Sequence, residues 1–249
     1  MISGAEVHVA GSAGTCDPPG MRLIGVVSHG NGAGKTRFIT GLLEANPGRF
    51  ATIKFTTVYR DGKFCPKDTQ RTCACTRLHD AFNVITDPAV LAQENTDTGR
   101  ITAAGARKVL WCLSREGAHL EAWQHVKELL APDEEIVTEG NSAMLVVPSD
   151  VLIFLVNPCM PRRFWKSNWR ALAERAHVVV VNEAPEAIGK RRPADEAERR
   201  ASMAEVQEAT PETPRIVARL TAPWAEWAGP LLEDLVGGRV APQAGSGPA

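Results

Sequence analysis

The amino-acid sequence predicts an α/β fold in which helices cover both faces of a mostly parallel β-sheet. Between residues 23 and 57 an apolar strand, a glycine-rich turn, a helix and a β-branched strand follow one another, which is the order of a βαβ unit. Two later runs, VLIFLV at 151–156 and HVVVV at 177–181, are continuously apolar, as in strands covered on both faces. Helical and strand patterns alternate from residue 117 onward, so we expect the sheet to continue through most of the chain.

The turn after the first strand carries a phosphate-binding pattern. It matches G-x-x-x-x-G-K-[ST] except at the first position, where histidine replaces glycine. Glycines let backbone amides turn toward a phosphate, and the following helix N-terminus adds positive potential. Lys35 would reach the β and γ phosphates, and the Thr36 hydroxyl would ligate Mg²⁺. A glycine-rich surface turn is the alternative, but a Lys-Thr pair at a helix start is what phosphate and magnesium chemistry require.

We therefore predict a three-layer P-loop NTPase fold that binds ATP or GTP with Mg²⁺. The residues expected to contact the nucleotide from this loop are His29, Gly30, Asn31, Gly32, Ala33, Gly34, Lys35, Thr36 and Arg37.

Composition points to one globular domain. A chain of 249 residues can bury one sizeable core, and a net charge of -1 with 44% hydrophobic residues does not suggest a polyanion-binding or disordered chain. We expect a flexible arm at 1–20, a P-loop domain at 21–236 with a cysteine-rich insertion at about 58–80, and a disordered tail at 237–249. The N-terminus lacks a secretory signal pattern and the apolar stretch 144–156 is interrupted. These features favour a cytoplasmic protein that binds neither nucleic acid nor membrane.

Polar residues at the ends of other predicted strands are candidates for the same site. In open α/β sheets ligands bind outside the carboxyl ends of the strands. Glu139, after the strand at 135–138, would hold the metal or orient an attacking water, although an ordinary strand-end acid explains it equally well. Asn182 would hydrogen-bond a purine edge, and Asp97 suits a magnesium site or the start of a capped helix. We also expect helices at 102–108 and 163–174.

A group of cysteines in the predicted insertion is the most distinctive feature of the sequence. Its spacing is Cys65-x7-Cys73-x-Cys75-x3-His79. Thiolates and an imidazole bind zinc, and three or four thiolates bind an iron-sulfur cluster, if the loop brings the ligands to one centre. Buried or simply exposed thiols are the alternative. Cys112 and Cys159 would contribute only if the fold brings them close, and a site shared across a dimer interface is a further possibility.

The chain resembles the molybdopterin-guanine dinucleotide biosynthesis protein B group. That group belongs to a class of P-loop proteins with metallocentre-maturation GTPases, dethiobiotin synthetase and the nitrogenase iron protein. The matching features, in order, are the GAGKT loop, Ile53-Lys54, Asp97-Thr98-Gly99-Arg100 with Ala104-Gly105-Ala106, and Thr138-Glu139-Gly140. The resemblance implies that Lys35 and Thr36 bind nucleotide and magnesium, that Asp97 lies near the magnesium, and that Glu139 is the acid after a Walker-B-like strand.

These observations predict an ATP or GTP hydrolase that acts as an accessory or maturation factor for a molybdopterin-type, iron-sulfur or other metal centre. Its catalytic residues would be Lys35, Asp97 and Glu139. We expect a homodimer and a metalloenzyme or cofactor-assembly protein as partner. An ATP-dependent small-molecule kinase or ligase, and a nucleotide-gated iron-sulfur or zinc carrier, are the alternatives.

Overall fold

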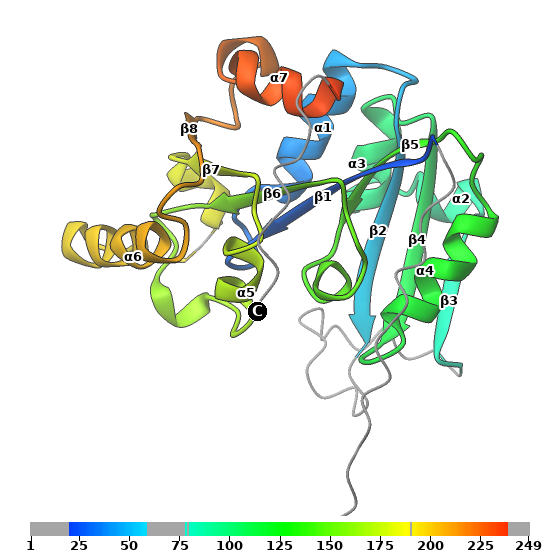
Figure 1. Ribbon diagram of the computed structural model, residues 1–249, viewed down its shortest axis with the longest axis horizontal. Coiled ribbons are helices and arrows are strands. Elements are labelled where there is room, and N and C mark those ends of the chain that lie inside the picture. The colour runs from blue at the N-terminus through cyan, green and yellow to red at the C-terminus, as the bar shows by residue number, and fades with distance from the viewer. Residues whose placement is uncertain (1–19, 59–77, 79, 190, 239–249) are drawn as a thin grey trace, which may run out of the picture.

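The computed structural model describes residues 20–58, 78, 80–189 and 191–238, without the side chains of residues 186 and 187. Within these residues the chain forms one eight-stranded sheet in the order β3-β4-β2-β5-β1-β6-β7-β8. All neighbouring strands are parallel except β3, which pairs antiparallel with β4 at one edge. Helices lie on both faces (Figure 1). The predicted three-layer α/β fold is confirmed.

The elements follow the alternation that the sequence predicts. The strands are β1 (Arg22–Ser28), β2 (Ala51–Val58), β3 (Phe82–Ile85), β4 (Lys108–Arg115), β5 (Glu135–Glu139), β6 (Val151–Val156), β7 (Val178–Asn182) and β8 (Arg215–Ala218). The α-helices are α1 (Lys35–Ala45), α2 (Pro88–Leu91), α3 (Asp97–Ala103), α4 (His119–Glu128), α5 (Trp169–Ala173), α6 (Glu196–Ala209) and α7 (Gly229–Gly237). Short 3₁₀ helices are η2 (Ala143–Leu145), η3 (Arg162–Phe164), η4 (Pro185–Ile188) and η5 (Trp224–Glu226).

Strand β1 lies at the point where the strand order changes direction. Its neighbours are β5 on one side and β6 on the other, both parallel to it. The chain first builds the sheet on the β5 side, with β2, β4 and β3, and then crosses to add β6, β7 and β8. In open α/β sheets such a change of direction is the place where ligands bind, at the carboxyl ends of the strands. The glycine-rich loop occupies this position.

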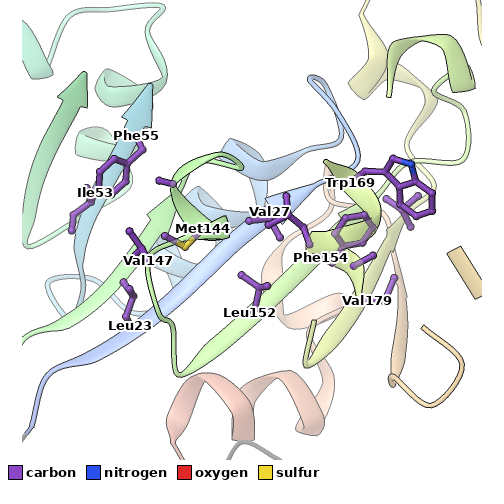
Figure 2. Packing of buried hydrophobic residues seen from close by; sticks show 14 of the residues in the cluster. Leu23, Val27, Ile53, Phe55, Met144, Val147, Leu152, Phe154, Trp169 and Val179 are labelled. Carbon is purple, nitrogen blue, oxygen red and sulfur yellow. The ribbon is translucent and has the colours of Figure 1, made fainter. Parts of the chain in front are cut away.

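The core has two parts, one on each face of the sheet. Along β1 the side chains alternate, so Val26 packs in one cluster and Val27 in the other. The cluster with Val26 includes residues of α1, α3 and α7, and Figure 1 shows α1 and α7 together on this face. The cluster with Val27 includes residues of α4, α5 and α6, and Figure 2 shows part of it around Met144 and Phe154. Burial on both faces explains why the central strands are continuously apolar.

The helix expected at 102–108 is wrong by about one and a half turns. Helix α3 covers Asp97–Ala103, and the Thr96 side chain caps it by accepting a 2.9 Å hydrogen bond from the amide of Gly99. Gly105 then adopts a φ of 92°, in the left-handed region, and Lys108 already pairs in β4. The cap explains the Thr-Asp sequence and places Asp97 in the first turn of the helix.

The helix expected at 163–174 is interrupted. Only η3 and α5 form, because between them the backbone of Trp165 is extended and pairs with the phosphate loop. Lys166 donates its amide to the His29 carbonyl at 2.8 Å, so this bond replaces one that a continuous helix would have made. A tertiary contact has here overridden local helical pattern.

Within the described residues, no helix is long and apolar enough to cross a membrane.

Candidate functional site

The phosphate loop joins β1 to α1 at the carboxyl edge of the sheet. Gly32 and Gly34 have φ values of 87° and 106°, which an L side chain adopts only with strain. A Cβ at Gly34 would also lie 2.8 Å from both Asn182 Nδ2 and Leu220 Cδ1. Helix α1 begins directly after this turn with Lys35, and its first turn contains no acidic residue. The positive end of α1 is therefore directed into the loop without a carboxylate of its own helix to neutralise it.

Lys35 places an ammonium group against this loop. Its Nζ donates to Ser28 Oγ at 2.9 Å and to the Gly30 carbonyl at 3.5 Å. Burial lowers the pKa of Lys35 to about 8, and Lys166 and Lys54 act in the same direction, whereas Glu139 opposes them. In the described part of the chain no carboxylate forms an ion pair with Lys35, so these residues compensate its charge only through the more distant Glu139 and Asp97.

Two carboxylates converge beside the loop. Glu139, at the end of β5, is buried, and its Oε2 accepts a 3.2 Å hydrogen bond from Thr36 Oγ1. Lys54 of β2 joins this carboxylate to Asp97, with Nζ 2.5 Å from Glu139 Oε1 and 2.8 Å from Asp97 Oδ2. Burial alone would lower the pKa of Lys54, but the two carboxylates outweigh it and raise that pKa. The structure thus brings Thr36, Asp97 and Glu139 together, and the magnesium site expected there stays a prediction.

The TEGN sequence, which spans the end of β5 and the two residues after it, has a second role that sequence reasoning missed. Gly140 has a φ of 154°, and a Cβ there would lie 2.6 Å from the Cβ of Phe55. Asn141 binds the last residue of β1 with both ends of its amide: Oδ1 accepts from the Ser28 amide at 3.2 Å and Nδ2 donates to the Ser28 carbonyl at 2.5 Å. These contacts fix β5 against β1 where the loop begins. The sequence feature that could have predicted this role was an asparagine directly after the glycine that follows the strand.

Lys54 was noted only as part of a family pattern, and its partners were missed. The available signal was a lysine inside the apolar strand FATIKFTT, because a charged side chain in a buried strand needs a carboxylate partner. Asp97 and Glu139 were already candidates for the same edge of the sheet. Combining the two observations would have predicted the bridge.

His29 does not present its side chain to the loop interior. The residue is fully buried, its amide donates to the Leu155 carbonyl at 3.3 Å, and its ring stacks on Trp165 at a centroid distance of 4.4 Å. The amide of Asn157 donates to Nε2 at 2.9 Å, so this nitrogen acts as an acceptor. Burial lowers the pKa of His29 to about 3, which keeps the ring neutral. The direct nucleotide contact expected for His29 is replaced by a supporting role.

Asn182 and Arg37 also have other partners than those expected. Asn182 is fully buried; its Nδ2 donates to the Ala33 carbonyl at 3.1 Å, and its Oδ1 accepts from the amides of Ala184 and Leu220 at 3.2 and 3.3 Å. This side chain supports the loop backbone. It therefore does not form the hydrogen bond to a purine edge that we expected from the sequence. Arg37 Nε donates to the Leu220 carbonyl at 2.9 Å, so its side chain joins α1 to the segment after β8.

The cysteine motif lies outside the described residues. This applies to Cys65, Cys73, Cys75 and His79. Among the residues that are described, no group of three or more His, Cys, Asp or Glu side chains is placed to hold a metal ion. Cys112 and Cys159 are buried and free, and burial raises the pKa of the Cys112 thiol to about 12.

These two thiols are not close to each other. Cys112 lies in β4 and Cys159 follows β6, and the strands β2, β5 and β1 separate them. Four strand spacings correspond to about 19 Å. The two thiols therefore cannot complete one site.

The sheet order, the loop between β1 and α1, and the Lys-Thr pair at the start of α1 are those of the three-layer α/β fold of P-loop proteins. No family model matches the chain, and no curated protein sequence matches it. The resemblance to the molybdopterin-guanine dinucleotide biosynthesis group stays a prediction.

Several solved structures are similar to this chain. The hydrogenase maturation factor HypB from Archaeoglobus fulgidus is similar with 13% identity and a TM-score of 0.45 over 88% of this chain and 90% of that chain. HypB from Helicobacter pylori, solved in complex with nickel, has 14% identity and a TM-score of 0.43 over 88% and 86%. LpxK from Aquifex aeolicus, in complex with ATP, has 11% identity and a TM-score of 0.42 over 79% of this chain and 53% of that chain.

Proposed function

We propose that this protein hydrolyses a nucleoside triphosphate at the loop between β1 and α1, with Mg²⁺. The observation that carries the proposal is the ammonium group of Lys35, which lies on the loop backbone without a carboxylate partner in the described part of the chain. Burying a cation is unfavourable unless an anion compensates it. The free N-terminus of α1 adds to the same positive potential. A polyphosphate supplies the missing negative charge.

The acidic side of the site fits a magnesium ion. Mg²⁺ prefers oxygen ligands, and the Thr36 hydroxyl with the carboxylates of Asp97 and Glu139 offers such a donor set, directly or through water. When bound, the ion would neutralise charge on the β and γ oxygens of the nucleotide. Lys54 holds the two carboxylates in position through its ion pairs with both.

In the proposed reaction a water molecule attacks the γ phosphorus, the bond to the β–γ bridging oxygen breaks, and nucleoside diphosphate and phosphate leave. Lys35 and the loop amides donate to the phosphoryl oxygens and stabilise the charge of the transition state. Glu139 or Asp97 orients the attacking water. The positions of Ser28 and Asn141 hold the loop in this form before substrate binds, so little reorganisation is needed.

We further propose that hydrolysis serves the assembly of a metal centre, with the cysteine motif as the metal-binding element. Support comes from the sequence spacing and from where the motif joins the fold. Val58, the last residue of β2, and Leu78 pack in one small cluster with Leu113. The three cysteines of the motif lie between these two residues in the sequence, and Val58 ends β2 at the carboxyl edge of the sheet, the same edge that carries the phosphate loop. A cofactor-assembly protein would be the partner, and a homodimer the expected state.

The test is the hydrolysis of ATP and of GTP by the full chain with Mg²⁺, compared between wild type, Lys35→Ala and Lys108→Ala. Lys108 is an exposed lysine at the start of β4 and serves as the control. We expect Lys35→Ala to abolish turnover and Lys108→Ala to leave it unchanged. Unchanged turnover in Lys35→Ala would refute the proposal. Rapid turnover only with an added acceptor would instead identify a kinase or ligase.

A further inference from the structure

The chain passes back over the start of the phosphate loop after β6. We call residues 157–166 the crossover segment. Gly30 forms an antiparallel bridge with Trp165, and the amide of Lys166 donates to the His29 carbonyl at 2.8 Å. At the other end of the segment, the amide of Asn157 donates to the His29 ring. The first two residues of the loop are thus bound to this segment at both of its ends.

His29 is the residue that makes this attachment possible. Its ring stacks on Trp165 with an interplanar angle of 26°, and Nε2 accepts the Asn157 amide, all in a fully buried position. Trp165 is itself fixed, because its Nε1 donates to the Met160 carbonyl at 3.2 Å. A glycine at position 29 would have neither the ring nor the acceptor. The departure from the usual loop pattern therefore has a structural reason: the side chain holds the crossover segment on the loop.

The crossover segment ends with a lysine beside the site. Lys166 is partly buried, and burial lowers its pKa, an effect that Glu139 opposes and Lys54 reinforces. Lys166 in turn lowers the pKa of Lys35. The Lys166 ammonium thus interacts electrostatically with Glu139, Lys54 and Lys35. No acceptor in the described part of the chain forms a hydrogen bond or ion pair with it.

We propose that Lys166 is a second phosphate-binding cation, positioned by His29, which contacts the terminal phosphate of the bound nucleotide. The inference rests on the proposed function. Lys35 contacts the loop with its ammonium group, the backbone of Lys166 is joined to the first residue of the loop, and neither lysine forms an ion pair with a carboxylate in the described residues. Two such cations at one loop are suited to a ligand of high negative charge.

The position of the Lys166 backbone favours contact with the terminal phosphate over contact with the other phosphates. Its backbone is joined to the first residue of the loop, whereas Lys35 and Thr36 lie at the other end, where α1 begins. Its charge acts on Glu139, whose carboxylate accepts a hydrogen bond from the Thr36 hydroxyl, the group that would hold magnesium in the proposed function. A diphosphate would still contact Lys35 and the helix N-terminus but would lose the group that Lys166 binds.

The experiment compares the affinity of a non-hydrolysable triphosphate with that of the diphosphate, both with Mg²⁺, in full-length variants. Lys166→Ala should weaken triphosphate binding about tenfold or more, as expected for a lost charge-assisted hydrogen bond, and change diphosphate binding less than about threefold. Lys166→Arg should restore most of the difference. Arg163→Ala removes an exposed cation from the same segment and should change neither affinity.

Equal effects of Lys166→Ala on both nucleotides, or no effect on either, would overturn the inference. His29→Gly should reproduce the selective loss of triphosphate binding by releasing the crossover segment, and if this variant does not fold, the Lys166 variants decide alone. Failure of the proposed function is distinguishable, because the wild-type protein would then bind neither nucleotide. If the wild type binds and hydrolyses nucleotide and Lys166→Ala behaves like the wild type, only the role of Lys166 is refuted.

Discussion

Replacing Lys35 with methionine should make the nucleotide-free protein more stable while it removes nucleotide binding. Burial lowers the pKa of Lys35 from 10.5 to about 8, so the folded protein holds this proton less tightly than the unfolded chain does. Methionine has a similar length and no charge. The substitution therefore removes a group whose position is set by function at a cost to the fold.

The size of the effect follows from the pKa difference. A change of about 2.5 corresponds to about 3 kcal/mol of destabilisation at about 1.4 kcal/mol per pKa unit. Lys35 is partly exposed, so water screens some of this cost. The variant also loses the hydrogen bond to Ser28, which contributes about 1 kcal/mol. We expect a net gain of about 1 kcal/mol at pH 7, or a rise in Tm of about 2–4 °C.

The stability difference between Lys35→Met and wild type should depend on pH in a direction that follows from the pKa of Lys35. Because the folded-state pKa is lower than the unfolded one, the destabilisation is fully present below about pH 8 and is lost as the pH rises from 8 to 10.5. The advantage of Lys35→Met should accordingly shrink between pH 7 and pH 9.5. Saturating nucleotide with Mg²⁺ should reverse the order at pH 7, because only the wild type gains stability from the ligand.

Thermal or urea unfolding of wild type, Lys35→Met and the exposed control Lys108→Met measures these differences. Lys108→Met should stay within about 0.5 kcal/mol of wild type at both pH values. A Lys35→Met variant that is less stable than wild type at pH 7, by an amount that does not change with pH, would refute the argument that this charge is held at a cost.

Two further predictions concern the backbone at β5 and the cysteine motif. Gly140→Ala should lower the free energy of unfolding by about 2–4 kcal/mol, because the new Cβ would lie 2.6 Å from the Cβ of Phe55 and the backbone conformation is strained for an L residue. Gly117 also has a positive φ but faces open space, so Gly117→Ala should lower it by only about 1 kcal/mol. Similar losses in the two variants would show that the contact with Phe55 does not matter. The double variant Cys73→Ser, Cys75→Ser should lose the metal that anaerobically purified wild type holds, as measured by metal analysis and a visible spectrum. Its nucleotide affinity, measured by titration, should stay unchanged. A metal content equal to that of wild type would disprove the metal-binding role.

Strand and loop patterns were sufficient to predict the architecture. The continuous apolar run at 151–156 is β6 residue for residue, because a strand covered on both faces has no polar positions to obscure it. The GAGKT pattern located the start of α1 because glycine and lysine are required there by backbone geometry and charge. The helix expected at 163–174 was wrong since its interruption comes from a bridge to Gly30, a residue more than a hundred positions away.

What the sequence determined by itself was therefore local: the strand–loop–helix order, the glycine turn, and a lysine, a hydroxyl and two acids at strand and helix ends. Only the tertiary structure decided which of these meet. It joined Glu139 to Thr36 and, through Lys54, to Asp97, because β5 lies between β1 and β2 in the sheet. It also turned Asn182 and the His29 ring inward as supports for the loop. Whether a side chain faces a ligand or braces the backbone depends on strand order and burial, which no local pattern contains.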